Sequence, residues 1–409
     1  TSNGSTSIKS KLPASGSTFG TLNATTGELR VFRLAFAAQG EFSQWCLDGT
    51  EATDAERIAK VLAEQVAQIT IVNGHIERDF GARVVIINDN EDIIFLDPDT
   101  DPFTATETDD INDEAQSVIT AEIGSDNFDV GHLIRRRTSG SGGNAGAIGS
   151  ICNDATKARG FTGRTDWNEI GVYSEIMLTH EFGHQFGGRH TFSHSRETGS
   201  VAQREVGGGS TIMAYAGITN QNVQMASDDY FHAGSIEQIQ ANMVGKTCPT
   251  STPITHSAPV VTAGANYTIP ISTPFMLTGS ATDAGGGALT YCWEQYDTMG
   301  NTQGGANSAA SPTKASGPNW RSYSPTTSPT RYFPNLNSVF NGSVTTSGSN
   351  ILVEALSSVA RTLNFRLTVR DNEINGGQTN FGNMTVTVDA TRGPLTVTSQ
   401  NTAGISYTH

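Results

Sequence analysis

Residues 171–190 read GVYSEIMLTHEFGHQFGGRH, and the spacing of their histidines decides how the rest of the chain is interpreted. His180 and His184 are four residues apart, so on a helix their imidazoles lie on one face, one turn apart. Two ring nitrogens in that arrangement can bind one Zn²⁺. Gly187 can adopt the positive φ that ends a helix, which brings His190 back as a third ligand. Three protein ligands leave a fourth position for water, as in catalytic rather than structural zinc sites.

Glu181 directly follows the first of these histidines. From there its carboxylate can hold a water at the metal and accept a proton from it. One metal site thereby explains every fixed residue of the pattern H-E-x-x-H-x-x-G-x-x-H. The alternative is three histidines in an ordinary helix and loop. Chance matches to H-E-x-x-H are common, but a match to the whole pattern by chance is rare.

This pattern resembles the signature of the metzincin zinc endopeptidases, which also have a methionine-containing turn beneath the metal. Residues 209–215, GSTIMAY, match that turn, with Met213 lying 23 residues after His190. Taken alone, Met213 would be read as an ordinary core methionine. Within the clan the chain is most similar to the reprolysin (adamalysin) branch, in a bacterial secreted form, and the resemblance covers roughly residues 28–250.

The resemblance implies an α/β catalytic domain with a mixed, mostly parallel twisted sheet and long helices. It also implies a secreted, extracellular enzyme that hydrolyses peptide bonds with a zinc-activated water and Glu181 as general base. A protein or peptide substrate would bind in extended form along a glycine-rich edge strand, which we place at residues 143–151. The alternative for that segment is a flexible glycine loop.

Tyr215 stands two residues after Met213. The astacin and serralysin branches carry a tyrosine there that reaches the metal, whereas the usual reprolysin pattern lacks it. Two interpretations of Tyr215 therefore stay open. It is either a switchable fifth ligand and oxyanion donor, or a packed aromatic residue.

The chain has four cysteines, and none forms a C-x-x-C pair, which argues against a thiolate zinc site. In reprolysin-like enzymes a cysteine before the active-site helix pairs with one near the end of the domain. The resemblance therefore implies a disulfide between Cys152 and Cys248. Cys46 and Cys292 have no such partner and are expected to be free buried thiols. His232 is expected to be structural, because three histidines already supply the metal ligands.

The net charge of −15 is unevenly spread. Residues 88–114 contain eleven Asp or Glu and no Lys or Arg. This balance argues against nucleic acid as a partner. The acidic run is read as a solvated loop, with a Ca²⁺ site formed by Asp97, Asp99 and Asp101 as the alternative. The run lacks the glycine and the terminal glutamate of an EF-hand loop.

No apolar run approaches the ~18 residues that a transmembrane helix needs, so we expect no membrane span. The chain begins at Thr1 rather than at a methionine, and we expect a mature or trimmed form. The expectation of secretion rests on the resemblance. We also expect a monomer.

We divide the chain where its pattern changes. The predicted divisions are an N-terminal tail or pro-segment remnant at 1–27, a peptidase domain at 28–250, a linker at 251–258, a β-sandwich at 259–390, and the start of a further module or a C-terminal tail at 391–409. The peptidase domain is predicted to contain strands at 29–36, 82–87, 92–96 and 129–134 and helices at 53–79, 111–123, 170–186 and 234–245.

Residues 259–390 contain short strands separated by Gly, Pro and Asn turns. The pattern is typical of an immunoglobulin-like or PKD-like β-sandwich with Trp293 in its core. Asp283 and Asp371 are predicted to cap turns, with Ca²⁺ binding as the alternative. We expect residues 1–250 to fold and cleave small peptides alone. The alternative function is an adhesion or polymer-binding protein, in which the sandwich targets the peptidase to a matrix such as collagen or mucin.

Overall fold

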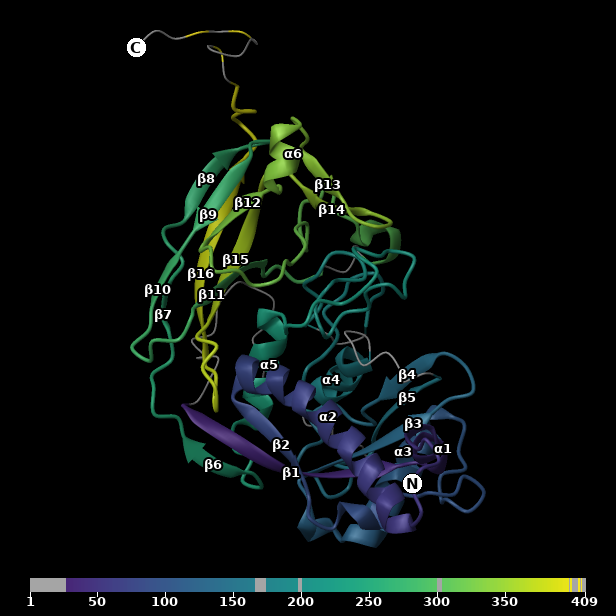
Figure 1. Ribbon diagram of the computed structural model, residues 1–409. Coiled ribbons are helices and arrows are strands. Elements are labelled where there is room, and N and C mark those ends of the chain that lie inside the picture. The colour runs from purple at the N-terminus through teal and green to yellow at the C-terminus, as the bar shows by residue number, and fades with distance from the viewer. Residues whose placement is uncertain are drawn as a thin grey trace, which may run out of the picture.

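The computed structural model describes residues 27–165, 174–197, 201–299 and 304–396, together with 398, 404 and 406. Figure 1 shows a lower part built around the single sheet of β1–β6 and an upper part built from the narrower sheets of β7–β16. Helix α5 (Ala233–Met243) lies between these two parts. Most of the predicted tail and the first residues of the predicted active-site helix lie outside the described residues. Among the helices described, none combines the length and apolar character needed to cross a membrane.

A six-stranded sheet organises the lower part, with strand order β2-β1-β3-β5-β4 and β6 paired to β1. Strand β1 runs parallel to β2 and β3, and β3 runs parallel to β5, whereas β4 and β6 are antiparallel to their neighbours. This confirms the predicted mixed sheet. The strands are β1 (Glu28–Ala38), β2 (Ala82–Ile86), β3 (Val130–Arg136), β4 (Ser141–Asn144), β5 (Gly160–Arg164) and β6 (Thr250–Pro253).

Helices pack on both faces of this sheet. Because side chains alternate along a strand, Phe32 and Phe36 of β1 point to one face, where they join α2 and α4, while Ala35 and Ala37 point to the other, where they join α3. The remaining helical segments in this part are short. The bounds are α1 (Gly40–Cys46), α2 (Asp54–Phe80), η1 (Asn90–Ile93), α3 (Thr108–Ile123), η2 (Ser125–Asn127) and α4 (Ser174–Gln185).

The long helix α2 begins and ends as its sequence predicts. The Thr53 side chain accepts from the Glu56 backbone N–H, and the Glu56 side chain accepts in return from the Thr53 N–H. This capping box satisfies N–H groups that have no partner inside the helix. Gly81 ends the helix at φ 63°, in the left-handed region that glycine adopts without a steric penalty.

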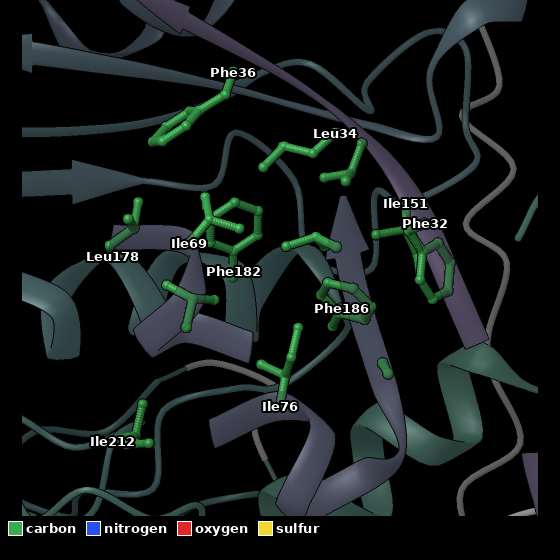
Figure 2. Packing of buried hydrophobic residues seen from close by; sticks show 14 of the residues in the cluster. Phe32, Leu34, Phe36, Ile69, Ile76, Ile151, Leu178, Phe182, Phe186 and Ile212 are labelled. Carbon is green, nitrogen blue, oxygen red and sulfur yellow. The ribbon is translucent and has the colours of Figure 1, made fainter. Parts of the chain in front are cut away.

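The active-site helix α4 is held by its apolar side chains. Leu178, Phe182 and Phe186 have no exposed surface, and they pack with Ile76 of α2 and Phe32 of β1 in the largest core cluster (Figure 2). Burying each side chain of this size contributes roughly 1.5–3 kcal/mol. The same helix therefore supplies His180 and His184 and the core contacts that fix them.

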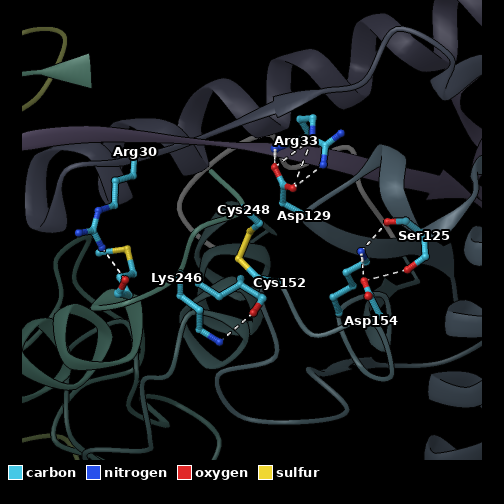
Figure 3. Close-up of a disulfide and its surroundings, with 11 residues drawn as sticks. Arg30, Arg33, Ser125, Asp129, Cys152, Asp154, Lys246 and Cys248 are labelled. Atoms are coloured by element: carbon cyan, nitrogen blue, oxygen red, sulfur yellow. Dashed lines mark hydrogen bonds and ion pairs between the residues drawn. A yellow bond between two sulfur atoms is a disulfide. The ribbon is translucent and has the colours of Figure 1, made fainter. Parts of the chain in front are cut away.

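The predicted disulfide is confirmed. Cys152 and Cys248 are bonded, with their Cα atoms 5.8 Å apart (Figure 3). The bond ties the segment before α4 to the segment after α5, and the Lys246 ammonium donates to the Ile151 carbonyl beside it at 3.0 Å. Cys46 and Cys292 are free, and Cys292 is buried as expected while Cys46 is partly exposed.

Two predicted strands are wrong in position or type. Residues 92–96 do not form a third strand, because Asn90 begins the 3-10 turn η1 and its side chain bonds the Phe36 N–H and carbonyl of β1. The edge strand lies at 141–144 rather than 143–151, since turns at 146 and 149 have positive φ and leave the strand. Strand β5 was missed, because the segment GFTGR has no apolar alternation.

The upper part is sheet-rich, as predicted, and has its own core around Trp293, whose indole donates to the Pro329 carbonyl at 2.9 Å. Its four-stranded sheet has the order β11-β15-β16-β8. The elements are β7 (Val260–Thr262), β8 (Tyr267–Pro270), β9 (Phe275–Thr278), β10 (Ser280–Thr282), β11 (Thr290–Gln295), η3 (Gly305–Ser308), β12 (Thr330–Phe333), α6 (Leu336–Phe340), β13 (Thr345–Ser347), β14 (Leu352–Ala355), β15 (Arg361–Arg370) and β16 (Thr379–Asp389).

The two parts are joined more closely than predicted. Residues 251–253, expected to be linker, belong to β6 and pair with β1. Arg370 of β15 forms a fully buried ion pair with Asp79 of α2 at 2.7 Å, and the Glu294 carboxylate of β11 accepts from the first N–H of α5 at 2.9 Å. Burial raises the pKa of Asp79, but the Arg370 and Arg78 guanidinium groups outweigh burial and hold that pKa well below its usual range. These contacts join the two parts, and the independent folding and activity of residues 1–250 stay a prediction.

Candidate active site

Three histidine nitrogens meet at the end of α4. The Nε2 atoms of His180, His184 and His190 lie 3.0–3.2 Å from one another. Ligands at 2.0–2.1 Å in a tetrahedral zinc site would be about 3.3 Å apart, so the spacing fits that ion closely. Among the described residues, this is the only group of three or more His, Cys, Asp or Glu side chains with ligand atoms gathered closely enough to hold a metal.

A sharp turn after α4 delivers the third histidine. Gly187 has φ 115°, and a Cβ there would lie 2.6 Å from the Asn242 Cβ. The Gly188 N–H donates to the Gly183 carbonyl at 2.8 Å and so closes the helix end. The sequence prediction for Gly187, a helix-ending turn that only glycine accommodates, agrees with this geometry.

Each histidine is oriented through its other ring nitrogen. His180 Nδ1 donates to the Ile212 carbonyl at 2.6 Å, His184 Nδ1 donates to the Gly188 carbonyl at 2.8 Å, and His190 Nδ1 faces the Glu197 carboxylate at 2.5 Å. A neutral imidazole that donates from Nδ1 has a lone pair on Nε2.

Burial keeps the imidazoles of His180 and His184 neutral. It lowers the pKa of His180 to about 3 and the pKa of His184 well below its usual value, and the neighbouring histidines add to both shifts. Three Nε2 atoms this close together can share one cation as ligands. The donor set therefore suits a zinc ion.

Glu181 lies beside this trio and is almost fully buried. Burial raises the pKa of its carboxyl to about 8 in the absence of a metal, and a nearby divalent cation would lower that pKa. The edge strand β4 packs directly on it. A Cβ at Gly143 would lie 2.6 Å from Glu181 Cγ and 2.7 Å from Oε1, so only glycine leaves room for the carboxylate.

Met213 lies under the same helix. Its side chain is fully buried, and a Cβ at Gly183 would lie 2.4 Å from its sulfur. Its carbonyl accepts from the N–H of Thr191, the residue after the third histidine, at 3.0 Å. The methionine turn thus contacts both the active-site helix and the segment that carries His190.

Residues 28–247 match the family model for reprolysin-like metallopeptidases of family M12B, which is more than half of the 409-residue chain. The chain belongs to this family. Its members use catalytic zinc, so the peptidase and metal predictions are confirmed at that level. The comparison with curated proteins gives no match.

In this M12B metallopeptidase Tyr215 lies among the rings of the site. Its ring centroid is 4.6 Å from that of His190 and 4.6 Å from that of Phe192. Burial raises the pKa of its hydroxyl to about 12, and the nearby Glu181 and Glu197 carboxylates add to that shift. Tyr215 is therefore placed beside the ligands as a neutral phenol.

His232 is structural, as expected. It caps the N-terminus of α5, where its Nδ1 accepts from the Gly234 N–H at 3.0 Å. Burial lowers its pKa to about 4.

The predicted calcium alternative is not supported. Asp97 accepts from the Asp99 N–H and the Thr100 hydroxyl, and Asp101 accepts from the Gly40 and Phe103 N–H groups. These carboxylates therefore close turns and anchor α1 rather than gathering around a cation.

In the upper part, Asp371 caps a turn by accepting from the N–H groups of Glu373 and Gln378, as predicted. Both carboxylate oxygens of Asp283 are buried without a hydrogen-bond partner among the described residues, so the turn-capping role predicted for Asp283 is not seen.

Sequence reasoning missed three residues of the site. Gly143 was noted only as part of a glycine-rich strand, Glu197 was not singled out, and neither was Glu205, which bonds the turn that carries Met213. None belongs to the eleven-residue pattern. The only sequence signal for the glutamates is their place between the third histidine and the methionine turn.

Proposed function

We propose that the chain is a secreted zinc endopeptidase that hydrolyses peptide bonds of extracellular proteins. The observation that carries this proposal is a single juxtaposition. Three imidazole nitrogens converge, the Glu181 carboxylate stands on the residue after the first of these histidines, and Gly143 of an edge strand packs against that carboxylate. A metal ion, a base and a place for an extended peptide are the three parts that metal-assisted peptide hydrolysis requires.

His180, His184 and His190 would hold the zinc. Zinc, when bound, lowers the pKa of a water toward ~7 and polarises the carbonyl to be attacked. Glu181 then acts on the proton. Its carboxylate accepts the proton of the attacking water and delivers it to the leaving amine. Glu181 is 6% exposed, so little bulk water reaches its carboxylate to compete for the proton.

Strand β4 supports the binding of extended substrates. It is the last strand of the sheet, and its only described neighbour is β5. Its outer edge therefore has N–H and carbonyl groups that can pair with a peptide by strand addition. The absence of a side chain at Gly143 lets a substrate backbone approach the Glu181 carboxylate.

Tyr215 is proposed to stabilise the oxyanion. Its phenol keeps its proton at neutral pH, since its pKa is raised to about 12, and it can donate to negative charge that develops on the carbonyl oxygen. Replacement by Phe should lower kcat by about 10²-fold and leave KM within about threefold, because the hydroxyl acts mainly in the transition state. An unchanged kcat would mean that Tyr215 only packs.

Other features of the chain support two further parts of the proposal, the compartment of the enzyme and its C-terminal sandwich. The Cys152–Cys248 disulfide suits an oxidising compartment such as the extracellular space. The core around Trp293 and the antiparallel strands around it support an immunoglobulin-like or PKD-like sandwich for residues 259–390. We propose a monomer.

Glu181→Gln tests the function. The amide cannot accept the proton, so cleavage of casein and of a quenched peptide should fall by about 10²–10⁴-fold with one zinc still bound. Glu122→Gln, an exposed change on α3, is the control and should behave as wild type. Turnover near that of wild type in the Glu181 variant, with its zinc content verified, would exclude this mechanism.

A further inference from the structure

Glu205 is a buried carboxylate that the catalytic mechanism does not use. Glu205 is 2% exposed, and none of the described Lys or Arg side chains forms an ion pair with its carboxylate. Instead it accepts from hydroxyl and backbone groups on two separate segments. The hydroxyls of Thr191 and Thr211 both donate to Oε2 at 2.5 Å, and the N–H groups of Ser210 and Thr211 donate to Oε1 at 2.9 and 3.3 Å.

Both segments belong to the zinc site. Thr191 directly follows the third histidine. Thr211 directly precedes Ile212, whose carbonyl accepts from His180 Nδ1, and Met213 follows. The carboxylate therefore bridges the segment that carries one ligand and the turn that orients another.

Backbone hydrogen bonds next to Glu205 also join its segment to Thr191. The N–H groups of Arg204 and Glu205 both donate to the Thr191 carbonyl at 2.8 Å. Gly209 has φ 73°, and a Cβ there would lie 3.1 Å from the Glu205 carboxylate and 2.6 Å from the Ala214 Cβ. A glycine at 209 thus makes room for the carboxylate, and the turn folds around it.

The groups around the two Glu205 oxygens are hydrogen-bond donors, which suits a carboxylate better than an amide. Hydrogen bonds from hydroxyls to a carboxylate at 2.5–2.7 Å are roughly twice as strong as neutral ones. A buried carboxylate is tolerated only when its oxygens are bonded, and here every bond comes from the two segments. Loss of the charge would therefore loosen one segment relative to the other.

We propose that Glu205 is a positioning residue of the zinc site: it holds the His190 segment and the methionine turn together so that the three Nε2 atoms converge. This inference rests on the proposed zinc site. Partners that orient metal ligands typically change metal affinity by 10–100-fold when they are replaced. Glu205 acts one step further out, through Thr191 and through the Ile212 carbonyl.

The test is zinc affinity, measured by competition with a chromophoric chelator. Glu205→Gln keeps the volume but places an NH₂ group where one of the oxygens accepts. The zinc dissociation constant should rise at least tenfold, and the visible absorption bands of the Co²⁺-substituted protein should shift. Glu354→Gln is the matched control, because Glu354 is equally buried and accepts from Arg331 and Thr346, both in the upper part. Its replacement should lower Tm but leave zinc affinity unchanged.

A milder pair of variants keeps the test decisive if Glu205→Gln fails to fold. Thr191→Val removes one hydroxyl donor at constant shape and should weaken zinc binding several-fold, whereas Thr191→Ser keeps the donor and should restore it. Wild-type zinc affinity in both Glu205→Gln and Thr191→Val, or equal affinities in the Val and Ser variants, would overturn the proposal. Failure of the wild-type protein to bind zinc would instead refute the proposed function.

Discussion

Gly143→Ala is the sharpest perturbation of the active site that the structure offers. The added Cβ would lie 2.6 Å from Glu181 Cγ and 2.7 Å from Oε1. Carbon atoms pack best at about 3.5–4.0 Å, so the carboxylate must retreat by about 1 Å. The atoms in the way all belong to the Glu181 side chain rather than to the backbone.

Gly143→Ala should change the reaction rate much more than it changes the stability of the protein. A misplacement of about 1 Å in a catalytic group can cost ~10²-fold in rate, which corresponds to about 2.7 kcal/mol. Stability should change by less than about 1 kcal/mol, because alanine in a strand gains roughly 0.5–1 kcal/mol over glycine and so offsets the repacking. We therefore expect a large loss of activity in a folded protein.

The assay is kcat and KM on a quenched peptide, with Tm and zinc content measured on the same samples. Gly142→Ala is the matched control, since a Cβ there would meet nothing closer than Arg137 Nη1 at 3.9 Å. Its kcat should stay within about twofold of wild type. A Gly143→Ala protein that is folded, holds zinc and retains kcat within threefold would refute the packing of β4 on Glu181.

Three further predictions concern stability. Cys152→Ser should lower the free energy of unfolding by about 3–5 kcal/mol in a urea titration, because the disulfide closes a loop with a sequence separation of 96; a loss below 1 kcal/mol would contradict it. Burial lowers the pKa values of His132 and His232 to about 4, so the unfolded state binds more protons than the folded state between about pH 4 and 6.5. The Tm of the metal-free protein should therefore fall as the pH is lowered through that window. A Tm that does not change with pH would contradict the burial of these two histidines in neutral form. Arg370→Met leaves the Asp79 carboxylate buried without its main partner and should lower the free energy of unfolding by about 3–5 kcal/mol. In a double-mutant cycle, adding Asp79→Asn to the same chain should recover part of that stability.

Local sequence signals predicted most of the catalytic part. The helical spacing of apolar residues predicted α2 to within one residue at each end, and the eleven-residue pattern singled out the three histidines whose nitrogens converge. These features depend on neighbours within a few residues. Strand β5 was missed for the same reason, because its side chains are small and its place in the sheet is fixed by β3 and β4 rather than by its own pattern.

Contacts between distant segments were beyond such reasoning. Nothing around Asp79 indicates that its partner is Arg370, and nothing around Glu205 indicates that its oxygens accept from Thr191 and Thr211. Polar residues of this kind are usually read as exposed. Their burial follows from how the upper part and the segment 191–211 fold onto the catalytic part, which periodicity does not encode.

The buried ion pair between Asp79 and Arg370 also sets an order of events during synthesis. Its two residues are 291 positions apart, and β16, which follows Arg370, bonds the Asp79 carbonyl through Thr379. A chain made from its N-terminus completes α2 and the histidine helix long before these partners emerge. We expect the nascent chain to remain loosely packed around Asp79 until then. Proteolytic activity would therefore arise only after synthesis has passed Thr379, well after the zinc-site histidines have been made.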